Sequence, residues 1–386
     1  MTMTDRTSIS REIMTDFARL TGLITAADAP ARYLWTDAFA VCNFLGLYGE
    51  TGDATFRELA LRLVAQVHST LGQYRPDDGR TGWISGLDGE EAASHPTAGG
   101  LRIGKQLKER KATEPLNERA EWDRDGQYFH YLTKWMHALD SVTRVTGDFT
   151  YNRWARELAA AGHARFVYAL SAGKTKRMYW KMSTDLSYPL VSSMGLHDPL
   201  DGLVTYTQLA ATAARDPERP GGLETERADM ADMCRGMSWV TDDPLGIGGL
   251  LADAYRVAQM TTAGVALPGL LVTLLEAAAT GLDALDREQM ESPAEYRLAF
   301  RELGLSIGLR AVQRLPRLIA ENRPLLEEED LDDRLADLRQ YERLAEAIET
   351  FWLDPQHEQA ASWTAHRHIN MVMLATSLSP GGYLTL

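Results

Sequence analysis

The chain has 386 residues, of which 45% are hydrophobic and 24% charged, as is usual for a globular protein. Its formal net charge of −14 disfavours a nucleic-acid partner, because a field of this sign repels phosphate backbones. Two cysteines, Cys42 and Cys234, are too few for a disulfide framework or a cysteine-based zinc site. No stretch approaches about 18 uninterrupted apolar residues, and the polar start of the chain lacks the apolar core of a signal peptide, so we expect no membrane partner and a cytoplasmic location.

Long helices are predicted from the first residues onward. Residues 8–23 place apolar side chains on one face, which is typical of an amphipathic helix. Residues 35–48 are apolar on most sides and predict a buried helix, and residues 53–71 form its amphipathic partner. The chain therefore begins its regular pattern with one inner and one outer helix.

A short motif, Thr-Gly-Asp, separates helices at two places, residues 51–53 and 146–148. Glycine supplies the left-handed residue that ends a helix, and aspartate one position later is a good N-cap for the next. The apolar positions after the first motif recur at the same offsets after the second. Each motif therefore predicts a tight turn within a helical hairpin.

Residues 72–125 interrupt this pattern, because they are rich in glycine, proline and charge. A segment of this length without regular structure is more often functional than idle, and we expect a long loop or lid. The helical pattern then resumes in pairs, with 126–146 and 148–170 as the second pair and 183–194 and 200–214 as the third.

The remaining chain continues in the same way after a polar stretch at 215–243. Residues 245–262 and 268–285 form a fourth pair, 293–315 and 338–353 a fifth, and 360–378 a sixth inner helix. The opening helix, 8–23, has no earlier partner and can pack beside this last one. With no convincing strand, the alternation predicts two concentric layers of helices.

In this organisation the chain resembles the six-hairpin, (α/α)6-toroid glycosidase superfamily. The resemblance depends on Trp35-Thr36-Asp37 at an inner-helix start, on the two Thr-Gly-Asp turns, and on the stretch Glu121-Trp122-Asp123-Arg124-Asp125-Gly126-Gln127-Tyr128. It implies an all-α (α/α)6 toroid as a single domain over residues 1–386, with the lid at 72–125. The superfamily includes glycoside hydrolases and sugar epimerases.

In such a toroid the inner helices begin at one mouth, where their free N–H groups favour polar ligands. Tryptophan and acidic residues are concentrated near these starts, and aromatic rings with carboxylates suit a carbohydrate. The predicted contacts with a small carbohydrate ligand are Asp37, Trp83, Asp123, Tyr128, His130, Trp180, Lys181, Trp239, Trp363, His366 and His368. No cofactor is predicted, and the spacing of the histidines does not support a metal site.

Hydrolysis of a glycosidic bond needs one protonated and one ionised carboxyl group. We predict a glycoside hydrolase in which Asp125 is one of this pair and Asp185 or Asp242 the other. Helix N-capping is a rival explanation for each of these aspartates, and for Asp37.

Two other functions stay open. A sugar epimerase or isomerase would use His366 or His368, because imidazole titrates in the right range for proton transfer at carbon. Positions i and i+2 of a helix do not share a face, so only one of the two would point inward. A non-catalytic carbohydrate-binding protein is the third possibility, and the sequence leaves a homodimer open.

Overall fold

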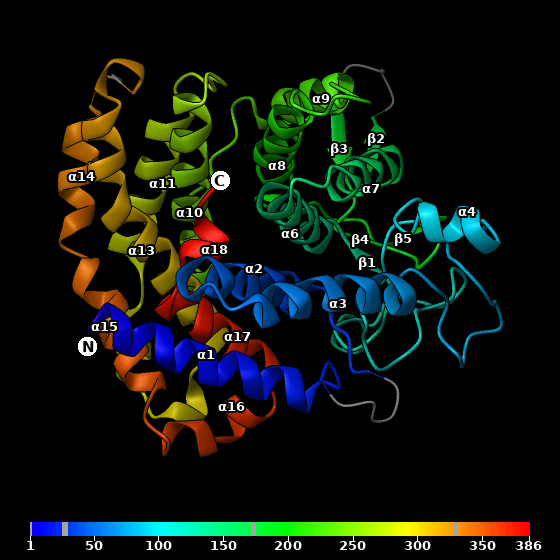
Figure 1. The fold of residues 1–386 in the computed structure, drawn as a ribbon, viewed down its shortest axis with the longest axis horizontal. Coiled ribbons are helices and arrows are strands. Elements are labelled where there is room, and N and C mark those ends of the chain that lie inside the picture. Colours follow the sequence, from blue (N-terminus) through cyan, green and yellow to red (C-terminus); the bar gives the residue numbers. More distant parts are fainter. Residues whose placement is uncertain (1, 25–29, 171–174, 327–329) are drawn as a thin grey trace. The chain divides into compact units, whose positions relative to one another are not determined.

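The computed structural model describes residues 2–24, 30–170, 175–326 and 330–386, and these are mainly α-helical (Figure 1). The chain divides into two compact units. Unit 1 comprises Met1–Phe17, Gly46–Asp53 and Ser238–Leu386, and unit 2 comprises Ala18–Leu45 and Ala54–Met237. The prediction of one domain over residues 1–386 stays a prediction.

In unit 2, fully buried helices alternate with amphipathic ones. Side chains of α6 (Phe129–Thr146) and α8 (Asp198–Ala213) are buried on nearly all sides, as is the unit 2 part of α2 (Leu34–Thr51). The partners α3 (Ala54–Leu71), α7 (Thr150–Phe166) and α9 (Glu224–Cys234) bury one face only. Helix α6 packs on its predicted partner α7 and also on α8, and α8 packs on α9.

The third pair is not the predicted one. Helix α8 covers the stretch predicted as an outer helix, yet its residues are buried almost throughout, and its partner α9 lies in the stretch predicted to be a polar excursion. Buried polar residues of α8 conceal its inner character in the sequence. Gln208, for example, donates to Asp140 over 2.7 Å and contacts His137 over 3.0 Å.

The predicted helix at 183–194 and the predicted absence of strands are both wrong. Strands β1 (Gln127–Tyr128), β4 (Lys181–Met182) and β5 (Pro189–Val191) form an antiparallel sheet in the order β1-β4-β5. Strands β2 (Val167–Ala169) and β3 (Lys176–Met178) form a second antiparallel pair. Between β4 and β5 the side chains of Ser183 and Asp185 accept the Ser187 N–H, and such local bonds compete with a helix.

Unit 1 repeats the alternation of buried and amphipathic helices. Helices α10 (Pro244–Thr262), α13 (Ala299–Glu321) and α17 (Arg367–Leu378) are largely buried. Helices α11 (Leu270–Ala284), α14 (Leu331–Arg339) and α15 (Glu342–Trp352) are amphipathic. The short helices of this unit are α12 (Arg287–Glu291), η1 (Ala294–Tyr296), η2 (Arg323–Leu325), η3 (His357–Gln359), α16 (Ala361–Thr364) and α18 (Gly381–Leu384).

The opening helix packs beside the last inner one, as predicted. The hydroxyl of Ser10 on α1 (Met3–Leu20) donates to the carbonyl of Ala375 on α17 over 3.3 Å. Arg6 donates to the Leu378 carbonyl over 3.1 Å. Helix α1 therefore supplies the outer partner that α17 lacks in sequence order.

Both Thr-Gly-Asp turns are confirmed. Gly52 and Gly147 adopt left-handed φ angles of 72° and 76°, and the N–H of each donates to the carbonyl four residues earlier, that of Tyr48 and of Thr143. The threonine hydroxyl of each motif accepts the aspartate N–H over 3.2 Å. The repeated motif therefore builds the same turn twice.

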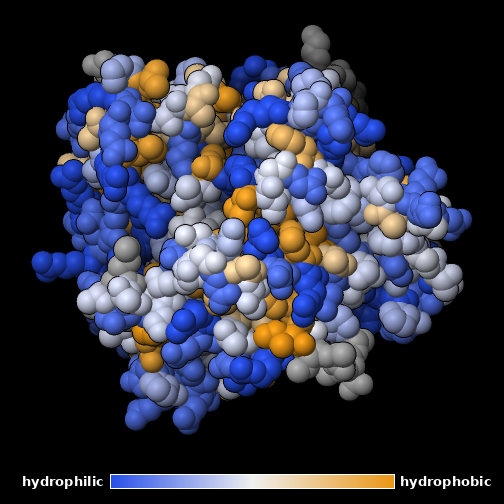
Figure 2. Space-filling model, viewed as in Figure 1, coloured by the Kyte–Doolittle hydropathy of each residue, from blue (hydrophilic) through white to orange (hydrophobic). Residues whose placement is uncertain are grey.

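Residues 72–125 form an irregular segment of unit 2 that contains only the short helices α4 (Gly89–Ser94) and α5 (Glu118–Glu121). Isolated bridges join Gln73 to Trp83 and Leu107 to Arg124. None of the helices in the described ranges is long and apolar enough to cross a bilayer. On the face shown in Figure 2, hydrophilic residues predominate and hydrophobic ones gather in narrow groups between them.

Candidate functional site

An aromatic cluster in unit 2 surrounds the imidazole of His130, the second residue of α6. Tyr128 stacks on it with centroids 5.3 Å apart, and Trp180 lies parallel at 6.3 Å. Tyr131 and Trp35 present their edges at 4.9 and 6.2 Å. We call these five residues the His130 cluster.

The local backbone explains why these rings meet. Strand β1 leads directly into α6, so residues 128–131 stand at the amino end of a buried helix. The β1–β4 register pairs Tyr128 with Lys181, which brings Trp180 beside it. Gly126 has φ +141°, and a Cβ there would lie 2.7 Å from the Met182 carbonyl, so only glycine permits this close pairing.

The imidazole of His130 faces a buried carboxylate on one side only. Its Nδ1 lies 3.5 Å from Oδ1 of Asp198, the first residue of α8. Neither Nδ1 nor Oδ2 of Asp198 has a hydrogen-bond partner among the described residues. Asp198 is buried while the His130 side chain is 23% exposed. The carboxylate of Asp198 therefore lies beside Nδ1, and the imidazole as a whole is partly exposed.

A second ion pair lies one turn further along the same two helices. The ammonium of Lys134 on α6 is 3.2 Å from the carboxylate of Asp201 on α8, and both side chains are nearly buried. Burial would raise the pKa of Asp201, but Lys134, with His197 and His130, holds it below its usual value. The pair is therefore ionised and fixes the spacing of the two helix starts.

A further phenol group, that of Tyr33, lies beside Tyr131 of the cluster. The hydroxyls of Tyr33 and Tyr131 lie 2.6 Å apart, and the ammonium of Lys105 lies 5.3 Å from the centre of the Tyr33 ring. Burial raises the pKa of Tyr128 well above that of an ordinary phenol. The hydroxyl of Tyr128 therefore stays protonated near neutral pH and can donate a hydrogen bond.

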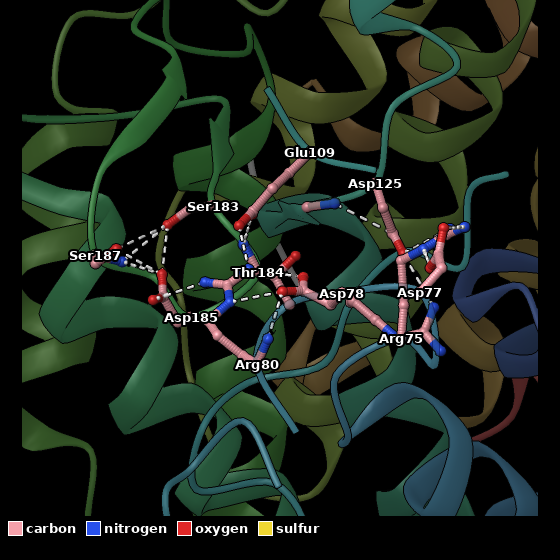
Figure 3. A network of polar contacts seen from close by, with 12 residues as sticks. Arg75, Asp77, Asp78, Arg80, Glu109, Asp125, Ser183, Thr184, Asp185 and Ser187 are labelled. Atoms are coloured by element: carbon pink, nitrogen blue, oxygen red, sulfur yellow. Dashed lines mark hydrogen bonds and ion pairs between the residues drawn. The ribbon is translucent and has the colours of Figure 1, made fainter. Parts of the chain in front are cut away.

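The two predicted catalytic aspartates of unit 2 lie in a network of arginine ion pairs (Figure 3). Asp125 is fully buried, and it accepts hydrogen bonds from Arg102 at 3.0 Å and from the Gly104 N–H at 2.9 Å. Arg75 also approaches its carboxylate, at 3.7 Å. These bonds saturate the carboxylate and hold the 72–125 segment together just before β1.

Asp185 is held in the same way by Arg80, which also bonds Asp78 and Glu109 (Figure 3). Although burial would raise the pKa of Asp185, hydrogen bonds from Ser187 and Ser183 bring it below its usual value. A general acid needs the opposite shift. The network therefore joins the 72–125 segment to the β4–β5 turn and does not resemble a hydrolytic pair.

The other predicted contacts in unit 2 divide between buried structural groups and surface positions. Asp37 accepts from Arg32 at 3.2 Å and from the Tyr33 N–H at 2.9 Å, and burial raises its pKa to about 6. The buried Lys181 ammonium donates to Glu121 and to two backbone carbonyls, all at 2.8 Å. Asp123 is exposed, and Trp83 packs against Gly72 in its own short bridge.

The predicted residues of unit 1 do not share one environment. Asp242 is exposed, and its neighbour Asp243 is the residue that caps α10. Trp239 and Trp363 are buried, and Trp363 stacks on Trp352 with centroids 5.5 Å apart. His366 is exposed with its edge toward Phe300, and His368 points its edge at Phe17.

The structure thus brings three of the predicted contacts, Tyr128, His130 and Trp180, close together, and adds neighbouring residues that the sequence did not indicate. The missed residues are Tyr33, Trp35 as a contact, Tyr131, Lys134, Asp198 and Asp201. The i, i+4 spacing of His130 and Lys134 and the i, i+3 spacing of Asp198 and Asp201 were the available signals.

No protein-family model and no curated protein sequence matches the chain. Among solved structures, a D-mannose isomerase has 10% sequence identity and a TM-score of 0.50, with 98% of each chain covered. A sugar epimerase from a ruminal bacterium has 10% identity and a TM-score of 0.49, covering 96% of this chain and 98% of that one. A cellobiose 2-epimerase from Spirochaeta thermophila DSM 6192 has 12% identity and a TM-score of 0.48, covering 95% and 97%.

The similarity to the D-mannose isomerase covers both chains and confirms the predicted fold class, an all-α (α/α)6 toroid. The prediction of a glycoside hydrolase is wrong, because the similar structure that is covered over 98% of its length is an isomerase and not a hydrolase. The arginine network around Asp125 and Asp185 agrees with this correction. In its fold the chain resembles the six-hairpin glycosidase-like superfamily.

Proposed function

We propose that the chain is a sugar isomerase or epimerase that moves a proton at the carbon next to the carbonyl of a small reducing sugar, with His130 as the base. The observation that carries this proposal is the partly exposed imidazole of His130, whose Nδ1 lies 3.5 Å from the buried Asp198 and which contacts four aromatic rings.

The chemistry of this arrangement suits proton transfer at carbon. Imidazole changes charge near neutral pH, so it can both accept and return a proton under ordinary conditions. A carboxylate close to an imidazole stabilises the imidazolium that forms when the ring takes up a proton, as in other acid–base pairs of histidine and aspartate. Asp198 supports that role for His130.

The aromatic rings support a sugar as the ligand. Sugars present flat C–H faces that stack on aromatic side chains, and Trp180 lies parallel to the His130 ring and half-buried. The fold similarity to a D-mannose isomerase favours a monosaccharide for the first tests. The cytoplasmic location and the homodimer stay predictions.

The histidines at the start of α17 remain alternative bases within the same function. His366 precedes the first residue of α17 and is exposed, and His368 is partly exposed. His366→Gln and His368→Gln therefore belong in the same assay as His130→Gln. Loss of proton exchange in only one of the three identifies the base.

The experiment incubates the protein with free D-mannose, D-glucose and cellobiose in deuterated water and follows them by proton NMR. We expect one sugar to lose its C2 proton signal and to give a new sugar without any increase in reducing ends. New reducing ends from the disaccharide without proton exchange would overturn the proposal. Saturable binding without exchange would instead identify the carbohydrate-binding protein considered above.

A further inference from the structure

Tyr33 and Tyr131 approach each other through their hydroxyls, next to the imidazole proposed as the base. The two oxygens are 2.6 Å apart, a short hydrogen bond for two neutral groups. Tyr131 follows His130 directly in α6, and their rings are 4.9 Å apart. Tyr33 precedes α2, so two different elements bring the phenols together.

The hydroxyls of Tyr33 and Tyr131 do more than pack against their neighbours. Both tyrosines are only partly buried, and the Tyr33 ring faces the ammonium of Lys105. The bond between the phenols lets a proton that leaves one be replaced from the other.

We propose that the Tyr33–Tyr131 pair relays a proton between two adjacent sugar oxygens, which makes the reaction an aldose–ketose isomerisation. This inference rests on the proposed function and on the same site. It extends that function, because simple inversion at C2 needs no net transfer between the oxygens, whereas isomerisation moves one proton from O2 to O1.

The steps balance without any added reactant. His130 Nε2 takes the C2 proton, the C–H electron pair forms the C1=C2 bond, and the carbonyl electrons move to O1. One phenol gives its proton to O1 and receives the proton of the second phenol, which in turn takes the proton from O2. The O2 electrons form the new carbonyl, and the C1=C2 electrons accept at C1 the proton held by the imidazolium.

The test compares Tyr33→Phe, Tyr131→Phe and the double variant on the sugar that the wild-type protein converts. Removing the relay slows ketose formation by on the order of 10²-fold, the usual effect of losing one acid–base group. C2 exchange with deuterated water falls less, because His130 remains, so the ratio of exchange to ketose rises. The double variant slows ketose formation no more than either single variant does, because both phenols serve one relay.

Tyr206→Phe is the matched control, since its phenol donates to the Ala159 carbonyl at 3.2 Å and lies in the same unit. In Tyr206→Phe the ratio of C2 exchange to ketose formation stays at the wild-type value. If the wild-type protein exchanges the C2 proton and the ratio is unchanged in Tyr33→Phe and Tyr131→Phe, the relay is overturned and the proposed function stands. Absence of exchange in the wild-type protein would overturn both.

A measurement on the wild-type protein covers the case in which the variants fold poorly. The rate of ketose formation is followed in mixtures of light and heavy water. A relay with two phenol protons in motion gives a bowed dependence on the deuterium fraction. A straight line contradicts the relay.

Discussion

Lys134 on α6 and Asp201 on α8 form an ion pair of 3.2 Å, one helical turn beyond His130 and Asp198. Two consecutive pairs therefore join the same faces of two buried helices. Both side chains of the Lys134–Asp201 pair are charged, whereas the His130–Asp198 pair presents a partly exposed imidazole. The distance between the starts of α6 and α8, and with it the orientation of His130, depends on the Lys134–Asp201 pair.

Lys134→Met should destabilise the fold, because it leaves the carboxylate of Asp201 buried without its partner. Breaking one side of a buried pair costs about 3–5 kcal/mol, whereas replacing both sides by apolar groups is often neutral. We expect the double variant Lys134→Met with Asp201→Leu to recover most of the free energy of unfolding measured in urea. A double variant as unstable as the single one would contradict this account.

His68 gives the fold a specific pH dependence. Burial lowers the pKa of His68 to about 3, and its Nε2 accepts the indole N–H of Trp135 at 3.2 Å, so the folded ring is neutral. The unfolded ring binds a proton below about pH 6.5, so this part of the stability is present above that pH and is lost as pH falls.

The expected loss is about 1.4 kcal/mol per pH unit below about 6.5, until the folded pKa is reached. Urea unfolding of the wild-type protein and of His68→Gln at pH 7.5 and 5.5 measures it. Gln keeps an acceptor for Trp135 and removes the titration, so the variant should show the smaller change between the two pH values. Equal changes in both proteins would refute this role.

The crossing of α10 and α13 depends on glycine at position 248. A Cβ there would lie 2.1 Å from the Gly304 carbonyl, so the two backbones would have to separate. We expect Gly248→Ala to lower the free energy of unfolding by about 1–3 kcal/mol. Gly249→Ala is the control, since nothing lies within 4 Å of its Cβ position, and it should stabilise by about 0.5–1 kcal/mol.

Arg80 holds the 72–125 segment to the β4–β5 turn through Asp185, so Arg80→Gln should loosen that segment. Limited proteolysis with mass spectrometry should show faster cleavage within residues 72–125 and an unchanged rate elsewhere. Arg119→Gln, an exposed change in the same segment, should behave as the wild-type protein does. Equal cleavage of both variants would show that the network does not hold the segment.

The parts of the fold that follow from local chemistry were predictable. Gly147 ends α6 because the turn needs a left-handed residue, and the apolar stripe of α3 is visible as periodicity. The strands were missed because the turn at Asp185 depends on side-chain bonds and on pairing with distant β1. Helix α8 was assigned to the wrong layer because its buried polar residues satisfy one another only in three dimensions.

The site was predictable only in part for a related reason. An acidic residue at the start of a helix or strand gives the same sequence pattern whether its carboxylate binds a ligand or pairs with an arginine. Asp125 is saturated by Arg102, which is 23 positions away in the chain, and no local pattern indicates this. His130 was found because it stands at an inner-helix start, but its partner Asp198 lies on the helix whose layer was misassigned.

The central claim is that His130 transfers the sugar proton, and the most direct test is C2 proton exchange measured for His130→Gln beside His95→Gln. His95 is the matched control, because it also pairs with a carboxylate, that of Glu157 at 2.6 Å, outside the His130 cluster. Loss of a general base predicts an exchange rate lower by about 10²–10⁴-fold in His130→Gln, with an unchanged rate in His95→Gln. A folded His130→Gln protein that exchanges the C2 proton at the wild-type rate would contradict the account.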